Sequence, residues 1–188
     1  MTTDKAMTNS YCIAVSKMDN SNPNVHYHNH EYGFPINCDD SLFGRLILEI
    51  NQAGLSWITI LKKKENIKKA YSNFNIRKVA EYTEKDRERL LQDSRIIRNK
   101  LKVNAAIHNA QVIIQLQKEN GAFKSWLDHH HPLTKEEWVK LFKKTFKFTG
   151  GEITNEFLMS TGYLKGAHDE LCPIYQKVIA TKPVWLTK

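Results

Sequence analysis

The chain has 188 residues, of which 41% are hydrophobic, 26% charged and 10% aromatic. This composition is typical of a globular protein and excludes a disordered acidic tail, a collagen-like polymer and a coiled-coil rod. The 28 Lys and Arg residues outnumber the 20 Asp and Glu residues, and the resulting net charge of +8 favours a polyanionic partner.

The sequence also bears on the compartment of the protein. No run of 18 apolar residues predicts a membrane-spanning helix, and the polar opening MTTDKAMTNS lacks the apolar core of a signal peptide. We therefore expect a cytoplasmic protein without membrane contact. Cys12, Cys38 and Cys172 are widely spaced and odd in number, which argues against a disulfide framework and leaves metal ligation or plain burial.

The predicted elements begin after an irregular segment. Residues 1–38 are rich in Asn and His, and no regular element is expected there. Apolar residues at helical spacing then predict a helix that starts after Asp39 or Asp40 and stops at Gly54. Ser56 is expected to cap a second helix, which runs into the basic segment KKKENIKK.

The rest of the chain continues with helical periodicity. Thr83 with Asp86, and Thr134 with Glu137, have the spacing of a capping box and predict two helix starts. We therefore expect an all-α chain with about seven or eight helices. The later predicted helices cover residues 83–92, 99–119, one turn at 123–127, 134 to about 146, 152–161 and a short stretch near 174–179.

Glu49 lies at the edge of the apolar stripe of the first predicted helix, three residues after Leu46. One interpretation is a glutamate that reaches sideways to solvent or to a lysine, since acids are rarely fully buried. The other is a carboxylate in a pocket wall that binds a cation or a base edge. Aromatic residues such as Trp57 and Tyr27 are usually core residues, but two of them near a carboxylate would sandwich a flat cationic ring.

A set of cysteines and histidines has the chemistry of a metal site. His168 and Cys172 are four residues apart, so a helix would place these two soft ligands one turn from each other. Cys12 and His28, near the other end of the chain, would complete a Cys2His2 set for tetrahedral zinc. The alternative is that these histidines are ordinary loop residues. Rival ligands are His26, His30 and the run at residues 129–131.

Basic residues gather in two segments of the chain. The first, at residues 62–69, is typical of a solvated helix face. The second spans a predicted turn between two helices, where backbone amides and cations together would form a phosphate contact. Its members are Arg95, Arg98, Lys100 and Lys102.

From Tyr11 to Cys172, the sequence resembles the bacterial DNA-3-methyladenine glycosylase I family. Several motifs occur in the order that the family has. They are YHNHEYG (residues 27–33), QAGLSWITILKK (residues 52–63) preceded by LEIN, LLQDSRIIRNKLK (residues 90–102), FKFTG (residues 146–150) and the H-x-x-x-C pair.

The resemblance implies an all-α, helix-hairpin-helix fold that binds alkylated double-stranded DNA. It also implies an enzyme that hydrolyses the N-glycosidic bond of 3-methyladenine and releases the free base. The family lacks the aspartate that related helix-hairpin-helix glycosylases use to support water attack, so no conventional general base is assigned. We expect a monomer with a glycosylase domain over residues 11–172, an extension at 1–10 and a tail at 173–188.

The resemblance also implies roles for single residues. Glu49 corresponds to the carboxylate that contacts the base, and Tyr27 and Trp57 correspond to the aromatic walls of the pocket. One structural zinc ion per chain is expected to join the two terminal segments through Cys12, His28, His168 and Cys172. The expected DNA contacts are Gln52, Gly54, Leu55 as the wedge, Arg95, Arg98, Lys100 and Lys102.

Three positions depart from the family pattern. Asn24 stands where members often have a tyrosine, and Arg95 and Leu101 stand where the hairpin often has glycine. If either hairpin residue needs a positive φ, the strain is about 1 kcal/mol. Two other functions are compatible with the sequence: a non-catalytic module that binds damaged DNA with the same fold, and a metal-binding structural protein without a nucleic-acid role.

Overall fold

The computed structural model describes residues 7–187. Within them every regular element is helical and no strand occurs, which confirms the all-α prediction. Residues 7–187 contain eleven α-helices, more than the seven or eight expected. They are α1 Ser10–Ser16, α2 Pro23–His30, α3 Asp39–Gln52, α4 Trp57–Ala70, α5 Ile76–Ala80, α6 Glu84–Gln92, α7 Lys100–Asn120, α8 Phe123–His130, α9 Lys135–Thr145, α10 Gly151–Ser160 and α11 Tyr175–Ala180, with 3-10 turns η1 Ser72–Phe74 and η2 Val184–Leu186.

The chain forms two compact units. The first joins the described residues up to Pro35 with those from Leu158 onward, and the second comprises Ile36–Phe157. The first unit therefore takes its residues from both ends of the chain. None of the helices between residues 7 and 187 has the length and apolar character needed to cross a membrane.

Over residues 7–38 the expectation of an irregular segment is wrong, because α1 and α2 lie there and contact each other. Residues 1–6 lie outside the described part of the chain. The Asn9 side chain accepts hydrogen bonds from the amides of Tyr11 and Cys12 and so caps α1. Asn22 caps α2 in the same way, and Pro23 fills the first helical position, which has no need of an N–H. The asparagines that suggested a loop are thus helix caps.

The two terminal segments share a small core in the first unit. Ile174 and Val178 are buried together with Cys12 and Cys172. The Asp169 carboxylate accepts hydrogen bonds from the Thr8 amide at 2.7 Å and the Asn9 amide at 3.2 Å. The short helix expected near residues 174–179 is present as α11, and its buried Val178 makes the tail part of this unit.

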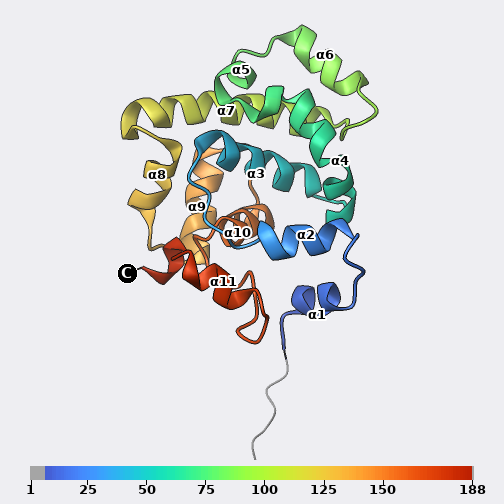
Figure 1. The fold of residues 1–188 in the computed structure, drawn as a ribbon. Coiled ribbons are helices and arrows are strands. Elements are labelled where there is room, and N and C mark those ends of the chain that lie inside the picture. The colour runs from blue at the N-terminus through green and yellow to red at the C-terminus, as the bar shows by residue number, and fades with distance from the viewer. Residues whose placement is uncertain (1–6, 188) are drawn as a thin grey trace, which may run out of the picture. The chain divides into compact units, whose positions relative to one another are not determined.

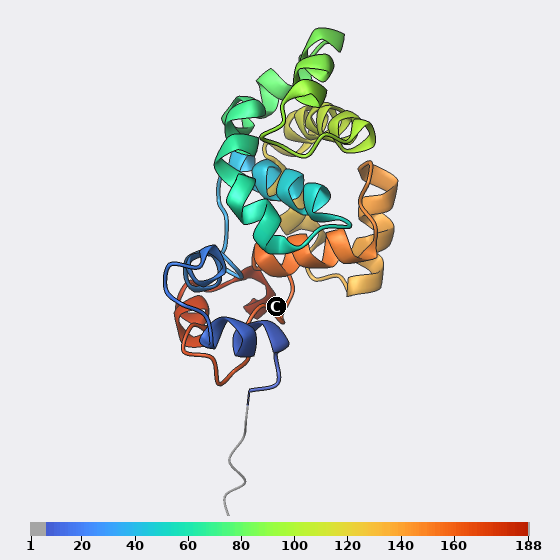
Figure 2. The ribbon, with the colours of Figure 1, turned by 90° about the vertical axis from the view of Figure 1, so that its right-hand side faces the viewer.

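The second unit is built around α3 and α7. Every residue of α3 from Leu42 to Asn51 is buried, as expected for a central helix that is covered on all sides. The long helix α7 packs against α3, α5, α6 and α8 (Figures 1 and 2). Gly44 brings α3 close to η1, because a Cβ at this position would lie 2.4 Å from the Phe74 ring.

Most predicted helix boundaries in this unit are confirmed. Thr134 and Glu137 form a capping box at the start of α9, and the Thr83 N–H and hydroxyl both bond the Asp86 carboxylate at the start of α6. The one turn expected at residues 123–127 is instead the full helix α8, which continues through His129 and His130.

Candidate base pocket, DNA-facing turns and metal centre

Glu49 is buried in the middle of α3, with 4% of its surface exposed. Burial raises the pKa of its carboxyl group to about 8, an effect that Arg45 opposes and Glu156 strengthens. Arg45 lies one helical turn before Glu49 and is also buried. The interpretation of Glu49 as a side chain that reaches sideways to solvent is therefore wrong, and the free carboxyl is protonated near neutral pH.

The two expected aromatic walls belong to different units. Tyr27 lies in α2 of the first unit, is 3% exposed, and packs its ring 5.5 Å from that of Tyr32. Trp57 is half-buried and is the first residue of α4 in the second unit, which also holds Glu49. Asn24, in place of a frequent family tyrosine, is buried at the start of α2 and bonds the Asn22 cap through its backbone and side chain.

The α3–α4 turn, residues 52–56, has the geometry of a type II β-turn. The Leu55 amide donates to the Gln52 carbonyl at 2.7 Å, Ala53 has φ −49° and ψ 118°, and Gly54 has φ +80°. The Gln52 side chain donates to the Leu55 carbonyl at 2.9 Å and closes the turn a second time. Leu55 is thereby held on a rigid turn with 38% of its surface exposed.

The α6–α7 turn, residues 93–99, joins α6 to α7. Ile96 is buried and fixes the middle of the turn, while the Asn99 side chain caps α7 by accepting from the Lys102 amide. The Arg95 guanidinium bonds both oxygens of Asp93 and lowers the pKa of that carboxyl. Neither Arg95 nor Leu101 has a positive φ, so the strain considered for these positions does not arise.

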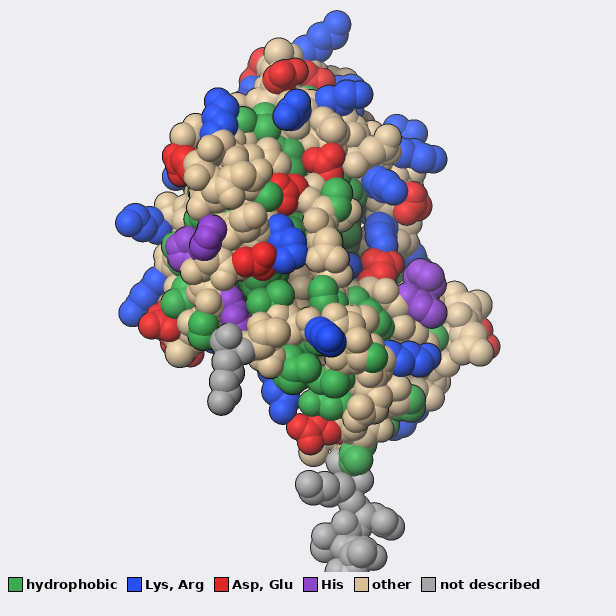
Figure 3. Space-filling view, turned by 60° about the vertical axis from the view of Figure 1, so that its left-hand side comes forward, with side chains coloured by type: hydrophobic (Ala, Val, Ile, Leu, Met, Phe, Trp, Pro, Cys, Tyr) green, Lys and Arg blue, Asp and Glu red, His purple; other side chains and the backbone are tan. Residues whose placement is uncertain are grey.

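The expected phosphate contacts differ in accessibility. Arg98 and Lys100 are exposed, and Arg95 is exposed but paired with Asp93. Lys102 is only 5% exposed, and its ammonium donates to the carbonyls of Asn51 at 2.9 Å and Ala53 at 2.6 Å. The assignment of Lys102 as a phosphate contact is corrected accordingly, since its donors point into the protein. On the face drawn in Figure 3, Lys and Arg side chains are interspersed with acidic ones.

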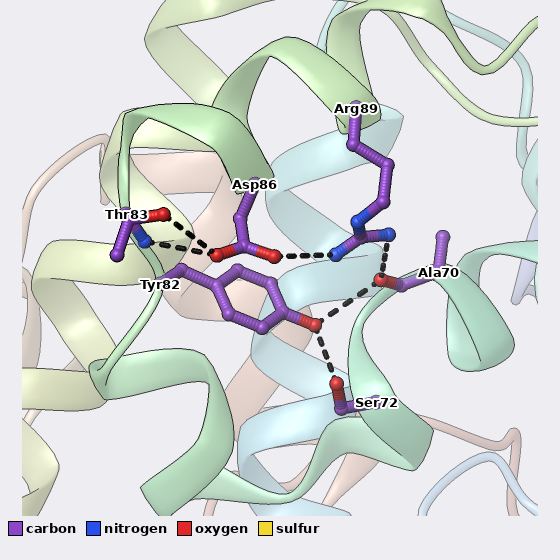
Figure 4. A network of polar contacts seen from close by, with 6 residues as sticks. All are labelled: Ala70, Ser72, Tyr82, Thr83, Asp86 and Arg89. Atoms are coloured by element: carbon purple, nitrogen blue, oxygen red, sulfur yellow. Dashed lines mark hydrogen bonds and ion pairs between the residues drawn. The ribbon is translucent and has the colours of Figure 1, made fainter.

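A polar network anchors α6 to the end of α4 (Figure 4). The Ala70 carbonyl accepts hydrogen bonds from Tyr82 at 3.2 Å and from Arg89 at 3.0 Å. Ser72 contacts the Tyr82 hydroxyl, and Arg89 also pairs with Asp86. The helix that leads into the α6–α7 turn is therefore fixed to the helix that follows the α3–α4 turn.

The four expected metal ligands lie together in the first unit. Cys12, His28, His168 and Cys172 are all buried, and one ligand atom from each lies within 4.8 Å of the other three. The four sulfur–nitrogen distances between the cysteines and the histidines are 3.4, 3.7, 3.8 and 3.9 Å. Tetrahedral zinc, with bonds of about 2.3 Å to sulfur and about 2.0 Å to nitrogen, places such atoms about 3.5 Å apart. This donor set therefore fits a zinc ion.

The hydrogen bonds of the two histidines orient them for ligation. The His168 Nε2–H donates to the Tyr32 carbonyl at 2.7 Å, and the His28 Nδ1–H donates to the Asn29 side-chain oxygen at 2.8 Å. The other nitrogen of each ring faces the cysteines with a free lone pair. Burial lowers the pKa of His168 to about 4 and lowers that of His28, so both rings are neutral, as ligation requires.

Sequence reasoning missed several residues around these sites. Arg45 precedes Glu49 by four residues, and this helical spacing was a usable signal for a neighbouring charge. Asn29 and Tyr32 orient the histidines, and Tyr32 acts through its backbone carbonyl, which carries no sequence signal. Lys63 of the basic segment donates to two carbonyls of the α6–α7 turn and is not simply a solvated charge.

Comparison with known sequences identifies a family for this chain. Residues 17–139 match the profile of the family described as Methyladenine glycosylase. DNA-3-methyladenine glycosylase 1 of Escherichia coli (strain K12) is 35% identical over 157 residues, covering 73% of this chain and 84% of that protein. DNA-3-methyladenine glycosylase of Haemophilus influenzae is 32% identical over 167 residues, covering 79% and 90%.

Solved structures with a similar fold agree with the sequence comparison. 3-Methyladenine DNA glycosylase I from Staphylococcus aureus, solved to explain 3-methyladenine recognition, has a TM-score of 0.76 at 30% identity, covering 83% of this chain and 93% of that chain. A tyrosine-to-phenylalanine variant of 3-methyladenine DNA glycosylase I in complex with 3-methyladenine has a TM-score of 0.79 at 28% identity, covering 89% and 97%.

Proposed function

Because this chain belongs to the methyladenine glycosylase family, we propose that it hydrolyses the N-glycosidic bond of 3-methyladenine in alkylated double-stranded DNA and releases the free base. The observation that carries this proposal is the buried carboxyl of Glu49 in the central helix of a chain with this family's fold. A buried acid is costly to a fold, so its presence calls for a functional reason. The names of the relatives favour an enzyme over a non-catalytic DNA-binding module.

Glu49 is proposed to recognise the charge of the damaged base. Methylation at N3 makes the adenine cationic and a good leaving group, so the main task of the enzyme is to extract and hold the right base. A cation near Glu49 lowers the pKa of its carboxyl group, which then ionises and accepts a hydrogen bond from the exocyclic amine. Neutral adenine offers no such compensation for a buried carboxylate and is disfavoured.

Aromatic and apolar residues are proposed to supply the remaining contacts. Tyr27 and Trp57 would stack on the everted base, with each such contact contributing about 1–3 kcal/mol. Leu55, exposed on the rigid α3–α4 turn, would act as the wedge that fills the duplex, while Gln52 and Gly54 shape that turn.

The α6–α7 turn is proposed to act as the helix-hairpin-helix element that grips the DNA backbone. The exposed side chains of Arg98 and Lys100 would bind phosphates without reading sequence, with Arg95 added if its pairing to Asp93 opens. This arrangement needs only one protein chain, and we propose that the enzyme acts as a monomer in the cytoplasm.

One structural zinc ion is proposed at Cys12, His28, His168 and Cys172. Burial raises the pKa of the Cys12 thiol to about 11, and a divalent cation would reverse this preference by binding the thiolate. The ion would contribute folding free energy by joining the two terminal segments of the first unit. We assign it no step in the reaction.

Replacement of the pocket residues tests the proposed reaction. Glu49→Gln and Trp57→Ala are expected to lower the release of 3-methyladenine from methylated duplex DNA by about 10- to 100-fold, because each removes an interaction with the everted base. Released base is measured by chromatography, and circular dichroism verifies that the variants fold. Glu65→Gln, at an exposed glutamate of α4, is the matched control and should leave release unchanged.

Two results would contradict this proposal. Wild-type rates in both pocket variants would refute the site assignment. Binding of wild-type protein to methylated duplex without any base release would instead identify a non-catalytic DNA-binding module.

A further inference from the structure

Two lysines of the second unit donate hydrogen bonds from their ammonium groups to backbone carbonyls. Lys102 stands in the first turn of α7, directly after the α6–α7 turn, and Lys63 stands in α4, after the α3–α4 turn. Lys102 contacts the end of α3 and the α3–α4 turn, which precede Lys63 in the chain. Lys63 contacts the α6–α7 turn, which precedes Lys102. The two connections therefore run in opposite directions between the same pair of turns.

The Lys102 connection is buried and short. Its ammonium donates to the carbonyl of Asn51, in the last turn of α3, and to the carbonyl of Ala53, inside the α3–α4 turn, at 2.9 and 2.6 Å. The same nitrogen lies 6.0 Å from the centre of the Phe148 ring. Carbonyls at a helix C-terminus lack partners within the helix and attract cations, which explains why this lysine tolerates burial.

The Lys63 connection runs the other way and is more exposed. Its ammonium donates to the carbonyls of Ser94 and Arg95 in the α6–α7 turn, at 3.2 and 3.0 Å. Within the same turn, the amides of Arg95 and Ile96 donate to Asp93, so the turn is also closed by its own hydrogen bonds. Neighbouring Lys62 is exposed and has no comparable contact to this turn.

We infer that Lys63 and Lys102 are positioning residues that form a reciprocal clasp, which fixes the wedge-bearing α3–α4 turn relative to the phosphate-binding α6–α7 turn. The inference rests on the proposed function, which assigns a DNA contact to each turn. Leu55 can enter the duplex at the target base only if the turn that binds the DNA phosphates holds it at the right position. A misplacement of about 1 Å can reduce a rate by about 100-fold. The clasp supplies this alignment without either lysine touching DNA.

Conversion of each lysine to methionine removes the clasp while keeping most of the side-chain volume. For Lys63→Met and Lys102→Met, we expect base release from methylated duplex to fall about tenfold or more, with a change of less than about twofold on the same DNA as single strands. Single-stranded DNA has no partner strand for the wedge to displace, so alignment of the two turns matters less. Urea unfolding verifies that each variant is folded at the assay temperature.

The salt dependence of duplex binding separates a clasp from a phosphate contact. A lysine that binds phosphate contributes about one unit to the slope of log affinity against log salt, so Lys100→Met should lower this slope by about one. Lys63→Met and Lys102→Met should weaken duplex binding with the slope unchanged. Lys62→Met is the control for Lys63, and its ratio of duplex to single-strand release should match that of the wild type.

Three outcomes would overturn the inference. A slope lowered by about one would make either lysine a phosphate contact, and equal losses on duplex and single strands would indicate general destabilisation. Unchanged duplex release would show that the clasp is dispensable. If Lys102→Met does not fold, the base release and salt dependence of Lys63→Met alone test the inference. Wild-type protein without base release would contradict only the proposed function, and the clasp would then be judged by duplex affinity.

Discussion

At the scale of single residues, Glu49 shows how burial changes the pKa of a side chain. Its spacing on α3 placed it at the edge of an apolar stripe, yet every residue around it on that helix is buried. Burial then moves the pKa of the carboxyl to about 8, a change larger than the opposing effect of Arg45. A neutral acid that becomes charged only beside a cation is suited to select an alkylated base.

Glu49 should also make the stability of the protein depend on pH. Since burial raises its folded-state pKa from 4.5 to about 8, the folded protein binds the proton more tightly than the unfolded chain. Its stabilising contribution is complete below about pH 4.5 and is lost as the pH rises to about 8. Relative to Glu49→Gln, the wild-type free energy of unfolding should fall by about 1.4 kcal/mol per pH unit across this window.

Urea unfolding of both proteins at a series of pH values measures this difference. Other titrating groups are common to the two proteins and cancel. Parallel stability curves between about pH 4.5 and 8 would show that the Glu49 carboxyl keeps its ordinary pKa in the folded protein.

At the scale of elements, turns and helix contacts set where the side chains project. The type II geometry of the α3–α4 turn requires φ +80° at Gly54, where a Cβ would meet no atom within 4 Å. Glycine is therefore needed there for its backbone conformation. At Gly44 glycine is needed for lack of space and not for its backbone conformation, because α3 packs directly against the Phe74 ring.

Gly44→Ala should destabilise the second unit. The added Cβ would lie 2.4 Å from a ring atom of Phe74, which is buried and follows two other residues with positive φ, so the ring has little freedom to move. Overpacking typically costs about 1–3 kcal/mol, while alanine regains about 1 kcal/mol of helix propensity. Because the approach of 2.4 Å places the overpacking cost in the upper part of this range, we expect a net loss of about 1–2 kcal/mol in urea unfolding.

Gly150→Ala is the matched control, since a Cβ there meets nothing within 4 Å and the φ of Gly150 is not positive. Its free energy of unfolding should stay within about 0.5 kcal/mol of the wild-type value. A Gly44→Ala variant as stable as this control would mean that η1 yields to the added methyl group.

At the scale of the whole molecule, one unit depends on joining the two ends of the chain. Its small core contains Cys12 and Cys172 themselves, so the proposed metal ligands are also packing residues. The Asp169 carboxylate adds a second link through Thr8 and Asn9, and the backbone N–H of Leu171 together with these groups lowers its pKa to about 2.

Removal of the metal should loosen the first unit selectively. We expect one zinc ion per chain by elemental analysis, and a Cys12→Ser/Cys172→Ser variant should lose it. Amide hydrogen exchange should then speed up in α1 and α11, while α7 of the second unit keeps its protection. Cys38→Ser, at the exposed cysteine, is the control and should retain both zinc and protection. Zinc-free wild-type protein with protected α1 amides would refute the site.

Local sequence signals predicted most of the second unit. Apolar spacing, the capping boxes at Thr83 and Thr134, and the glycine after α3 are interactions within a few residues, and the structure confirms the helices that they predicted. In the first unit the same kind of signal existed, since Asn22 before Pro23 is a helix start, but the high Asn content suggested a loop. The family motifs predicted the set of two cysteines and two histidines that the fold brings together.

By itself, the sequence determined the helical class, the positions of the main helices, the family and the members of the Cys/His set, because these depend on local periodicity and on motifs. Only the tertiary structure decided that Glu49 is protonated when free, that Lys102 faces carbonyls and not phosphate, and that α11 shares a core with Cys12. Burial and hydrogen-bond partners come from residues distant in the chain, and they fix the charge and direction of a side chain. No spacing in the sequence records those neighbours.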